Sequence, residues 1–233
     1  MTVKKGLLAL IFLTTVSAAI AQEKALVHVN GEHIVHVEPD EAEINFMVTT
    51  NHKNLQAAKN ENDAVVSKAI AYLKKQQGIA EKDIRTTRVN VNPYNEYVKD
   101  GKPIPMFRAQ QSIQLKLTEL DKLAGLLSGL VELGVNNIQN VEFKSSRIEQ
   151  IQNDARAQAM LDAKQKATIL AEALGQSIQQ AYTIHDNTSS NNGPRPMMAM
   201  YKSAEMSADS MQEPIATGEI EVAARVSVSF LLK

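Results

Sequence analysis

The C-terminal stretch Glu219–Lys233 reads EIEVAARVSVSFLLK and decides the fold class. Every second side chain in it is apolar, from Ile220 through Val226 and Val228 to Leu232. Because successive side chains of a strand point to opposite faces, this alternation predicts one continuous strand with an apolar face. Strands of soluble proteins usually have about 3–10 residues, so this one is unusually long.

Shorter patterns of the same kind precede the closing strand. Residues 23–50 read as strand, turn, strand, and every second residue from Ala42 to Val48 is apolar. Further strands are expected at residues 88–92, 113–117, 136–143 and 178–185.

Three segments have helical periodicity instead. They are residues 55–77, which Gly78 ends, a helix that Thr118 caps and Gly134 ends, and residues 148–174. The third would be about 40 Å long at 1.5 Å per residue. Its apolar positions are mainly alanine, which lets a neighbouring backbone approach closely. Strands interspersed with helices favour an α+β fold, a two-layer sheet-and-helix domain.

The first residues have the layout of a secretory signal peptide, residues 1–21. Lys4 and Lys5 form a basic region, residues 7–16 are apolar, and Ala19-Ile20-Ala21 is a small-x-small cleavage pattern. Without the two lysines, the 25 basic residues of the chain become 23, against 26 acidic ones. This mildly acidic balance lacks the basic excess that phosphate-backbone binding needs, so nucleic acid is not an expected partner. With no cysteine, the chain has no disulfide or thiol chemistry.

Five motifs, in this order, carry a resemblance to a known family. They read VNGEHIVHVEPDEAEINF, DIRTTRVNVNPY, GVNNIQNVEF, DARAQAMLDAKQKATILAEALG and PIATGEIEVAARVSVSF. Together they resemble the SIMPL-domain family of exported bacterial proteins, of the periplasmic immunogenic and oxidative stress defence types. Two positions depart from the family pattern: His33 stands where a second glycine is common, and Met106-Phe107 where Gly-Tyr is common.

The resemblance implies a fold and a mode of action. It implies a main αβ domain of residues 22–117 and 180–233, with a mobile loop at 186–213, and a smaller inserted αβ subdomain of residues 118–179. Members of this type are thought to form large ring- or channel-like homo-oligomers, and no enzymatic activity is established for them.

Two polar clusters were considered for chemistry. His28, His33 and His36 lie close in sequence, but strand alternation puts residues an odd number apart on opposite faces, so His33 and His36 diverge unless a turn separates them. Asp40, Glu41 and Glu43 sit at a strand start and on its solvent face, as solvated carboxylates do. Nucleophile-elbow, phosphate-loop and zinc-protease motifs are lacking. We therefore predict a protein that is not an enzyme, with no catalytic residue and no cofactor.

The stretch Pro194–Met211, PRPMMAMYKSAEMSADSM, holds five of the nine methionines. Thioethers are soft ligands suited to Cu(I), and the candidate ligands are Met197, Met198, Met200, Met206 and Met211, with His185. Closing a flexible connector around an ion costs conformational entropy. A partner-contacting loop or a plain linker is therefore favoured over a metal site, and sacrificial methionine oxidation is a further alternative.

These observations favour an exported, non-enzymatic envelope protein that assembles with itself and supports tolerance of envelope or oxidative stress. The long closing strand and the alanine-faced helix expose more regular surface than one chain readily buries. We expect it in the periplasm, with association with the outer membrane left open. The alternative is a periplasmic ligand- or metal-binding module that uses the cleft between subdomains or the methionine-rich loop.

Overall fold

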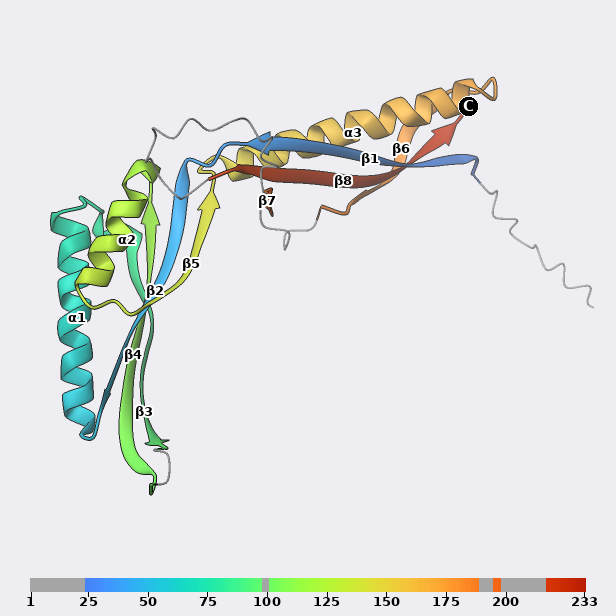
Figure 1. Ribbon diagram of the computed structural model, residues 1–233. Helices are drawn as coiled ribbons and strands as arrows, with labels where there is room; N and C mark the ends of the chain where they lie inside the picture. Colours follow the sequence, from blue (N-terminus) through green and yellow to red (C-terminus); the bar gives the residue numbers. More distant parts are fainter. Residues whose placement is uncertain (1–23, 98–100, 189–194, 198–216) are drawn as a thin grey trace, which may run out of the picture.

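The computed structural model describes residues 24–97, 101–188, 195–197 and 217–233, and it has the expected α+β class (Figure 1). Its strands form two antiparallel sheets, each with helices on one face. We call them the terminal sheet and the central sheet, and each sheet with its helices a lobe.

The terminal sheet joins the two ends of the chain. Its strands are β1 (Leu26–Val37), β8 (Glu219–Leu232), β6 (Ile178–Asp186) and β7 (Arg195–Met197), with β8 between β1 on one side and β6 and β7 on the other. One helix, α3 (Ile148–Glu172), lies along β1 and β8 (Figure 1). The closing strand and the long third helix are thus confirmed. Most of the expected loop 186–213 lies outside the described residues, and the short strand β7 inside it was not expected.

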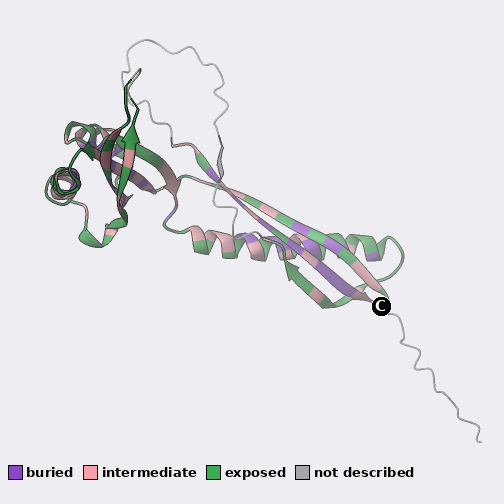
Figure 2. Cartoon of the chain, turned by 90° about the horizontal axis from the view of Figure 1, so that it is seen from below, coloured by how far each residue is buried: buried purple, intermediate pink, exposed green. Residues whose placement is uncertain are grey.

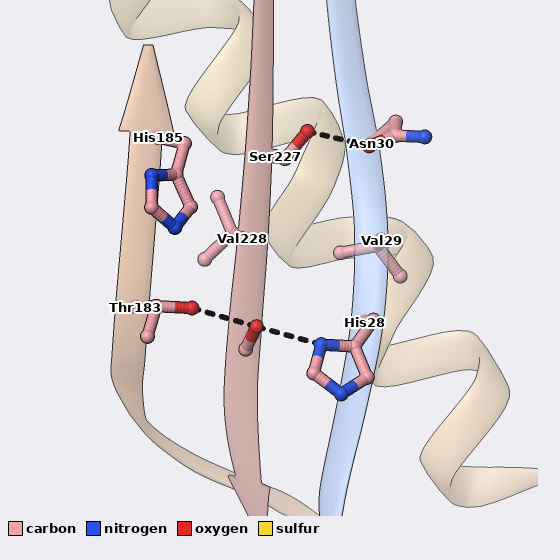
Figure 3. Close-up of a pocket in the computed structure, with 8 residues that line it drawn as sticks. His28, Val29, Asn30, Thr183, His185, Ser227 and Val228 are labelled. Atoms are coloured by element: carbon pink, nitrogen blue, oxygen red, sulfur yellow. Dashed lines mark hydrogen bonds between the residues drawn. The ribbon is translucent and has the colours of Figure 1, made fainter.

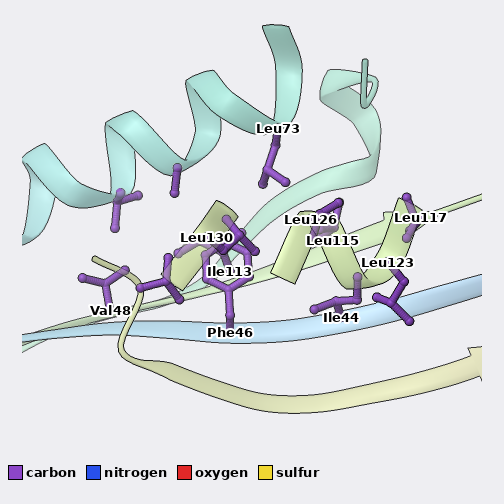
Figure 4. Packing of buried hydrophobic residues seen from close by; sticks show 13 residues of the cluster. Ile44, Phe46, Val48, Leu73, Ile113, Leu115, Leu117, Leu123, Leu126 and Leu130 are labelled. Carbon is purple, nitrogen blue, oxygen red and sulfur yellow. The ribbon is translucent and has the colours of Figure 1, made fainter. Parts of the chain in front are cut away.

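The central sheet has the order β3-β4-β2-β5. Its elements are β2 (Glu41–His52), α1 (Leu55–Lys75), β3 (Ile84–Glu96), β4 (Ile104–Leu117), α2 (Leu123–Glu132) and β5 (Asn137–Lys144), with short 3₁₀ turns at Glu81–Asp83 and Leu120–Lys122. One face of the sheet packs on α1 and α2 around an apolar core (Figure 4). The buried core residues are Ile44, Phe46, Val48, Val66, Ala69, Leu73, Ile113, Leu115, Leu117, Leu123, Leu126, Leu130 and Val135.

The boundaries of the two lobes along the chain differ from the domain boundaries that the family resemblance implied. Residues 41–144 build the whole central lobe, so the segment 118–179 spans α2 and β5 of that lobe and then α3 of the other. The two strands expected in residues 23–50 are confirmed as β1 and β2, which Glu38-Pro39-Asp40 separates, and β1 pairs with β8 without interruption through Gly31. Glu38-Pro39-Asp40 contains no glycine, the residue that tight hairpin turns favour, and here the chain passes from one sheet into the other.

Of two further expectations, both about helix ends, one is confirmed and the other is wrong. Gly78 and Gly134 follow α1 and α2 with φ of 70° and 99°, the left-handed conformation expected of glycine after a helix. Thr118 does not cap α2, because a 3₁₀ turn precedes the helix and its N-cap residue is Lys122, which makes no side-chain cap bond.

Gly31 is the point where α3 comes closest to β1. A Cβ atom there would lie 1.9 Å from the Ala159 carbonyl oxygen and 2.9 Å from the Ala163 nitrogen. The face of α3 that makes this approach consists of Ala155, Ala159, Ala163, Ala167 and Ala171, all buried. Small residues on both the strand and the helix therefore set the spacing between α3 and β1 in the terminal lobe.

Most buried residues of β8 alternate with more exposed ones (Figure 2), and Ala224, Val226, Val228 and Phe230 form one buried cluster with the alanines of α3. The opposite face of the terminal sheet carries the polar side chains described below. No helix within the described residues is long and apolar enough to span a membrane.

Replacing Gly31 with alanine should destabilise the protein by about 3 kcal/mol or more, because the added methyl group overlaps helix backbone that cannot move away as a flexible side chain can. Urea unfolding followed by circular dichroism measures the change. The matched control is Gly125→Ala in α2, where a Cβ atom has open space; it should be neutral or stabilise by up to about 1 kcal/mol. Equal stability of the two variants would contradict the close approach of α3.

Candidate functional site

A polar groove lies on the face of the terminal sheet opposite α3 (Figure 3). It encloses about 430 Å³. Its polar lining comes from three adjacent strands: His28 and Asn30 of β1, Ser227 and Ser229 of β8, and Thr183 and His185 of β6.

Strand alternation places these side chains together. Val29 and Val228 belong to the core under α3, so their neighbours in each strand point to the other face. The register sets His28 and Thr183 on either side of Ser229, and Asn30 and His185 on either side of Ser227. In the sequence, the alternation of valine with serine in VSVSF was the available signal for this polar face.

Hydrogen bonds connect the groove across the strands. The Thr183 hydroxyl donates to Ser229 Oγ over 2.7 Å, and Ser229 Oγ lies 2.7 Å from His28 Nδ1 (Figure 3). Besides accepting from Thr183, the Ser229 hydroxyl can either donate to Nδ1 or accept from it, so the direction of its bond with His28 depends on the tautomer of the ring. Two residues away on β8, Ser227 Oγ donates to Asn30 Oδ1 over 2.8 Å and accepts from the Asn187 amide over 2.6 Å.

The contact between Ser229 and His28 has the distance of a nucleophile–base pair. Among the described residues, no third side chain bonds to the other nitrogen of His28. Ser229 also lies in the central strand of the sheet, where the main-chain N–H groups are used in pairing with β1 and β6. The groove offers hydroxyl, amide and imidazole groups that can donate or accept hydrogen bonds.

The three N-terminal histidines do not come together. His28 lines the groove, and His36 lies 3.8 Å from Glu219 farther along the same face. His33 is an odd number of residues from both, so strand alternation places it on the face of Val29, toward α3. The predicted divergence of His33 and His36 is confirmed. Within the described ranges, no group of three or more His, Cys, Asp or Glu residues could hold a metal ion.

The methionine candidates fall almost wholly outside the described residues. Met198, Met200, Met206 and Met211 are in residues 198–216, and only the backbone of Met197 is described, at the end of β7. His185 lies in the groove.

Asp40 joins the two segments that connect the lobes. Its carboxylate accepts the hydroxyl and the backbone N–H of Ser146, each over 2.6 Å, and its own N–H donates to the Lys144 carbonyl over 3.1 Å. Asp40 stands between β1 and β2, and Ser146 between β5 and α3. The Ser146 hydroxyl and then its N–H lower the pKa of Asp40 below its usual value.

The other two carboxylates of this cluster also have structural partners. Glu41 pairs with Lys116. Burial alone would raise the pKa of Glu43, but the Lys144 ammonium 2.8 Å away, together with Gln114, lowers it below its ordinary value. These carboxylates are used in ion pairs and hydrogen bonds across the central sheet, as is usual for polar residues on a solvent face.

The fold and the groove define an α+β protein of two lobes with a polar surface site. A family model described as SIMPL, a protein of unknown function (DUF541), matches residues 27–230. The chain therefore belongs to the SIMPL family.

Several relatives match over most of their length. The chain is 33% identical to the uncharacterized protein YggE of Edwardsiella ictaluri, over 82% of this chain and 79% of the relative. It is 31% identical to the uncharacterized protein YggE of Escherichia coli K12, over 99% and 94%. It is 27% identical to the 26 kDa periplasmic immunogenic protein of Brucella melitensis, over 92% and 90%.

Asp40→Asn should weaken the connection between the lobes. Water screens this exposed carboxylate, so the expected loss of unfolding free energy is about 1 kcal/mol at neutral pH. Because the pKa of Asp40 is lower in the folded chain, its stabilising effect is present above about pH 4 and is lost as the pH falls further. The difference between variant and parent, measured by urea unfolding, should therefore shrink in acid. Glu38→Gln makes the same charge change two residues away and should have little effect; a pH-independent loss in Asp40→Asn would contradict the argument.

Proposed function

We propose that this SIMPL protein is exported to the periplasm, where it has no enzymatic activity, assembles with copies of itself, and supports tolerance of envelope or oxidative stress. The name of the Brucella relatives supports the periplasm, and so does the signal-peptide pattern. The groove supports a non-enzymatic role, because in the part of the chain that the structure describes no third side chain bonds to the histidine beside its serine.

The observation that carries self-assembly is a difference between the two edges of the terminal sheet. The outer edge of β1 is closed by α3. Asp162 Oδ2 accepts the Glu32 N–H over 2.9 Å, and Lys166 Nζ donates to the Asn30 carbonyl over 3.2 Å. Asp162 and Lys166 also bond to each other over 2.7 Å. Together the two side chains replace one pair of hydrogen bonds that a further strand would make.

The edge formed by β6 has no such cover. In the described part of the chain, no strand pairs with its outer side, and two large apolar side chains stand exposed there, Tyr182 at 50% and Ile184 at 57%. The central sheet likewise ends in β3, where Val89 is 61% exposed. Proteins usually block exposed strand edges, because unpaired edges add strands from other chains. Edges left open on two sheets support assembly of several copies, which closes into a ring when the contacts repeat around an axis.

Ile184→Lys should shift the assembly toward monomers, because a charge on an edge strand opposes edge-to-edge pairing. We expect the concentration for half-assembly of residues 22–233, measured by light scattering and native mass spectrometry, to rise by about tenfold or more, the effect of about 1.4 kcal/mol. The matched control is Ile34→Lys on β1, whose edge α3 covers, and it should assemble as the parent does. A parent protein that is monodisperse and monomeric at micromolar concentration would refute the proposal.

The stress role can be separated from assembly in cells that lack their own SIMPL protein. We expect the parent chain to restore survival after hydrogen peroxide treatment, and Ile184→Lys to restore less at equal periplasmic abundance. Full rescue by that variant would show that protection does not need the assembled form.

A second candidate function is a periplasmic ligand-binding module. The observation that favours it is the groove, whose hydroxyl, amide and imidazole groups suit a small polyhydroxy ligand. A ligand of this kind should raise the melting temperature of the parent. Ser229→Ala, which removes the bond shared with Thr183 and His28, should abolish the rise. A ligand was expected from the sequence either in the cleft between subdomains or at the methionine-rich loop. The groove is a different site, on one face of the terminal sheet, although Asn187 of the segment 186–213 bonds to its Ser227.

A further inference from the structure

The hairpin of β3 and β4 extends beyond the sheet that supports it. Pairing of β2 with β4 ends at His52 and Phe107, whereas β3 and β4 continue to pair through Tyr94 and Met106 to Glu96 and Ile104. We call residues 93–97 and 101–107 the arm. In Figure 1 the arm projects past the end of α1, on the side of the central lobe away from the terminal lobe.

The arm carries apolar and aromatic side chains where no helix covers them. The chain has only five tyrosines and five phenylalanines, yet Tyr94, Tyr97 and Phe107 all belong to the arm. Tyr97 is 79% exposed, more than any other aromatic side chain of the described residues. Ile104 and Met106 complete the set and are only partly buried. A two-stranded hairpin is marginally stable in water by itself, so an extension of this kind gains stability when a partner covers it.

Charge around the arm is opposite to that of the whole chain. Among the described residues between 88 and 108 stand three basic residues, Arg88, Lys102 and Arg108, against one acidic residue, Glu96, whereas the net charge of the whole chain is −1. Arg108 lies 4.4 Å from the centre of the Tyr94 ring, so cation and aromatic ring occupy one face. Lys102 is exposed.

We propose that the arm docks on the surface of a membrane that contains anionic phospholipids. Tyrosine and phenylalanine favour the boundary between headgroups and acyl chains, where the ring is in an apolar environment and the tyrosine hydroxyl remains hydrated. Lysine and arginine beside them bind lipid phosphates, and an anionic leaflet attracts such a basic segment. The arm lies in the interface and does not cross the bilayer. Docking does not require self-assembly, because each chain carries a complete arm.

The test is flotation of residues 22–233 with vesicles of phosphatidylethanolamine and phosphatidylglycerol, and with vesicles of phosphatidylcholine alone. We expect binding to the anionic vesicles, weaker binding to the neutral ones, and release by salt. The double variant Tyr97→Ser, Lys102→Glu should reduce partitioning into the anionic vesicles about tenfold or more, through one lost aromatic anchor and one reversed charge. Both residues are exposed, so the variant should unfold at the same urea concentration as the parent.

The matched control is Leu174→Ser, Lys164→Glu, which removes an equally exposed apolar side chain and makes the same charge reversal in the terminal lobe. It should bind the vesicles as the parent does. Three results would overturn the proposal: no binding of the parent to anionic vesicles, equal loss in both variants, or an arm variant that binds vesicles normally but has a changed assembly mass. The last result would assign the arm to contacts between copies.

Discussion

The close approach of α3 to β1 at Gly31 is the constraint on which the terminal lobe depends. An alanine face buries little area per residue, and the buried cluster of this lobe consists of alanine and valine with Phe230, without the leucines that fill the central core. Its stability comes instead from backbone-to-backbone contact along a long helix, since dispersion attraction falls steeply when a gap opens between packed atoms. A methyl group at Gly31 or a larger side chain at Ala159 would hold the two elements apart.

The same proximity makes the terminal sheet asymmetric. A helix this close to β1 brings Asp162 and Lys166 within hydrogen-bonding distance of the outer edge of that strand, where they bond to Glu32 and Asn30. β6, on the far side of β8, lies largely outside the area that α3 covers, as its exposed Ile184 shows. Thus the packing that completes one edge leaves the other available, and no separate blocking element is needed on β1.

The periodicity of the sequence predicts individual strands and helices, but it does not predict which strands share a sheet. Alternation in Glu219–Lys233 and alanine spacing in residues 148–174 are local signals, and both elements were predicted. Which strands share a sheet depends on long-range pairing, which alternation alone does not specify because any two apolar faces are compatible. The role of Gly31, close packing against Ala159 and Ala163 of α3, likewise depends on residues that are far apart in sequence. The groove escaped prediction for the same reason, as its residues come from three strands that only the register brings together, although serine alternation in VSVSF marked one of them.

The two proposals have a joint consequence through the connection between the lobes. The central lobe leaves the terminal lobe at residues 38–40 and rejoins it at residues 145–147, and Asp40 bonds these two segments together at Ser146. This bond limits rotation of one lobe against the other. If terminal lobes join around an axis, every copy then presents its arm in an equivalent position, and all arms of a ring face the same side. Several weak contacts made at once hold far more strongly than one, because after the first the others are intramolecular. An assembly of this kind would bind a membrane that a single chain leaves readily, so edge pairing on one lobe would set the membrane affinity of the other.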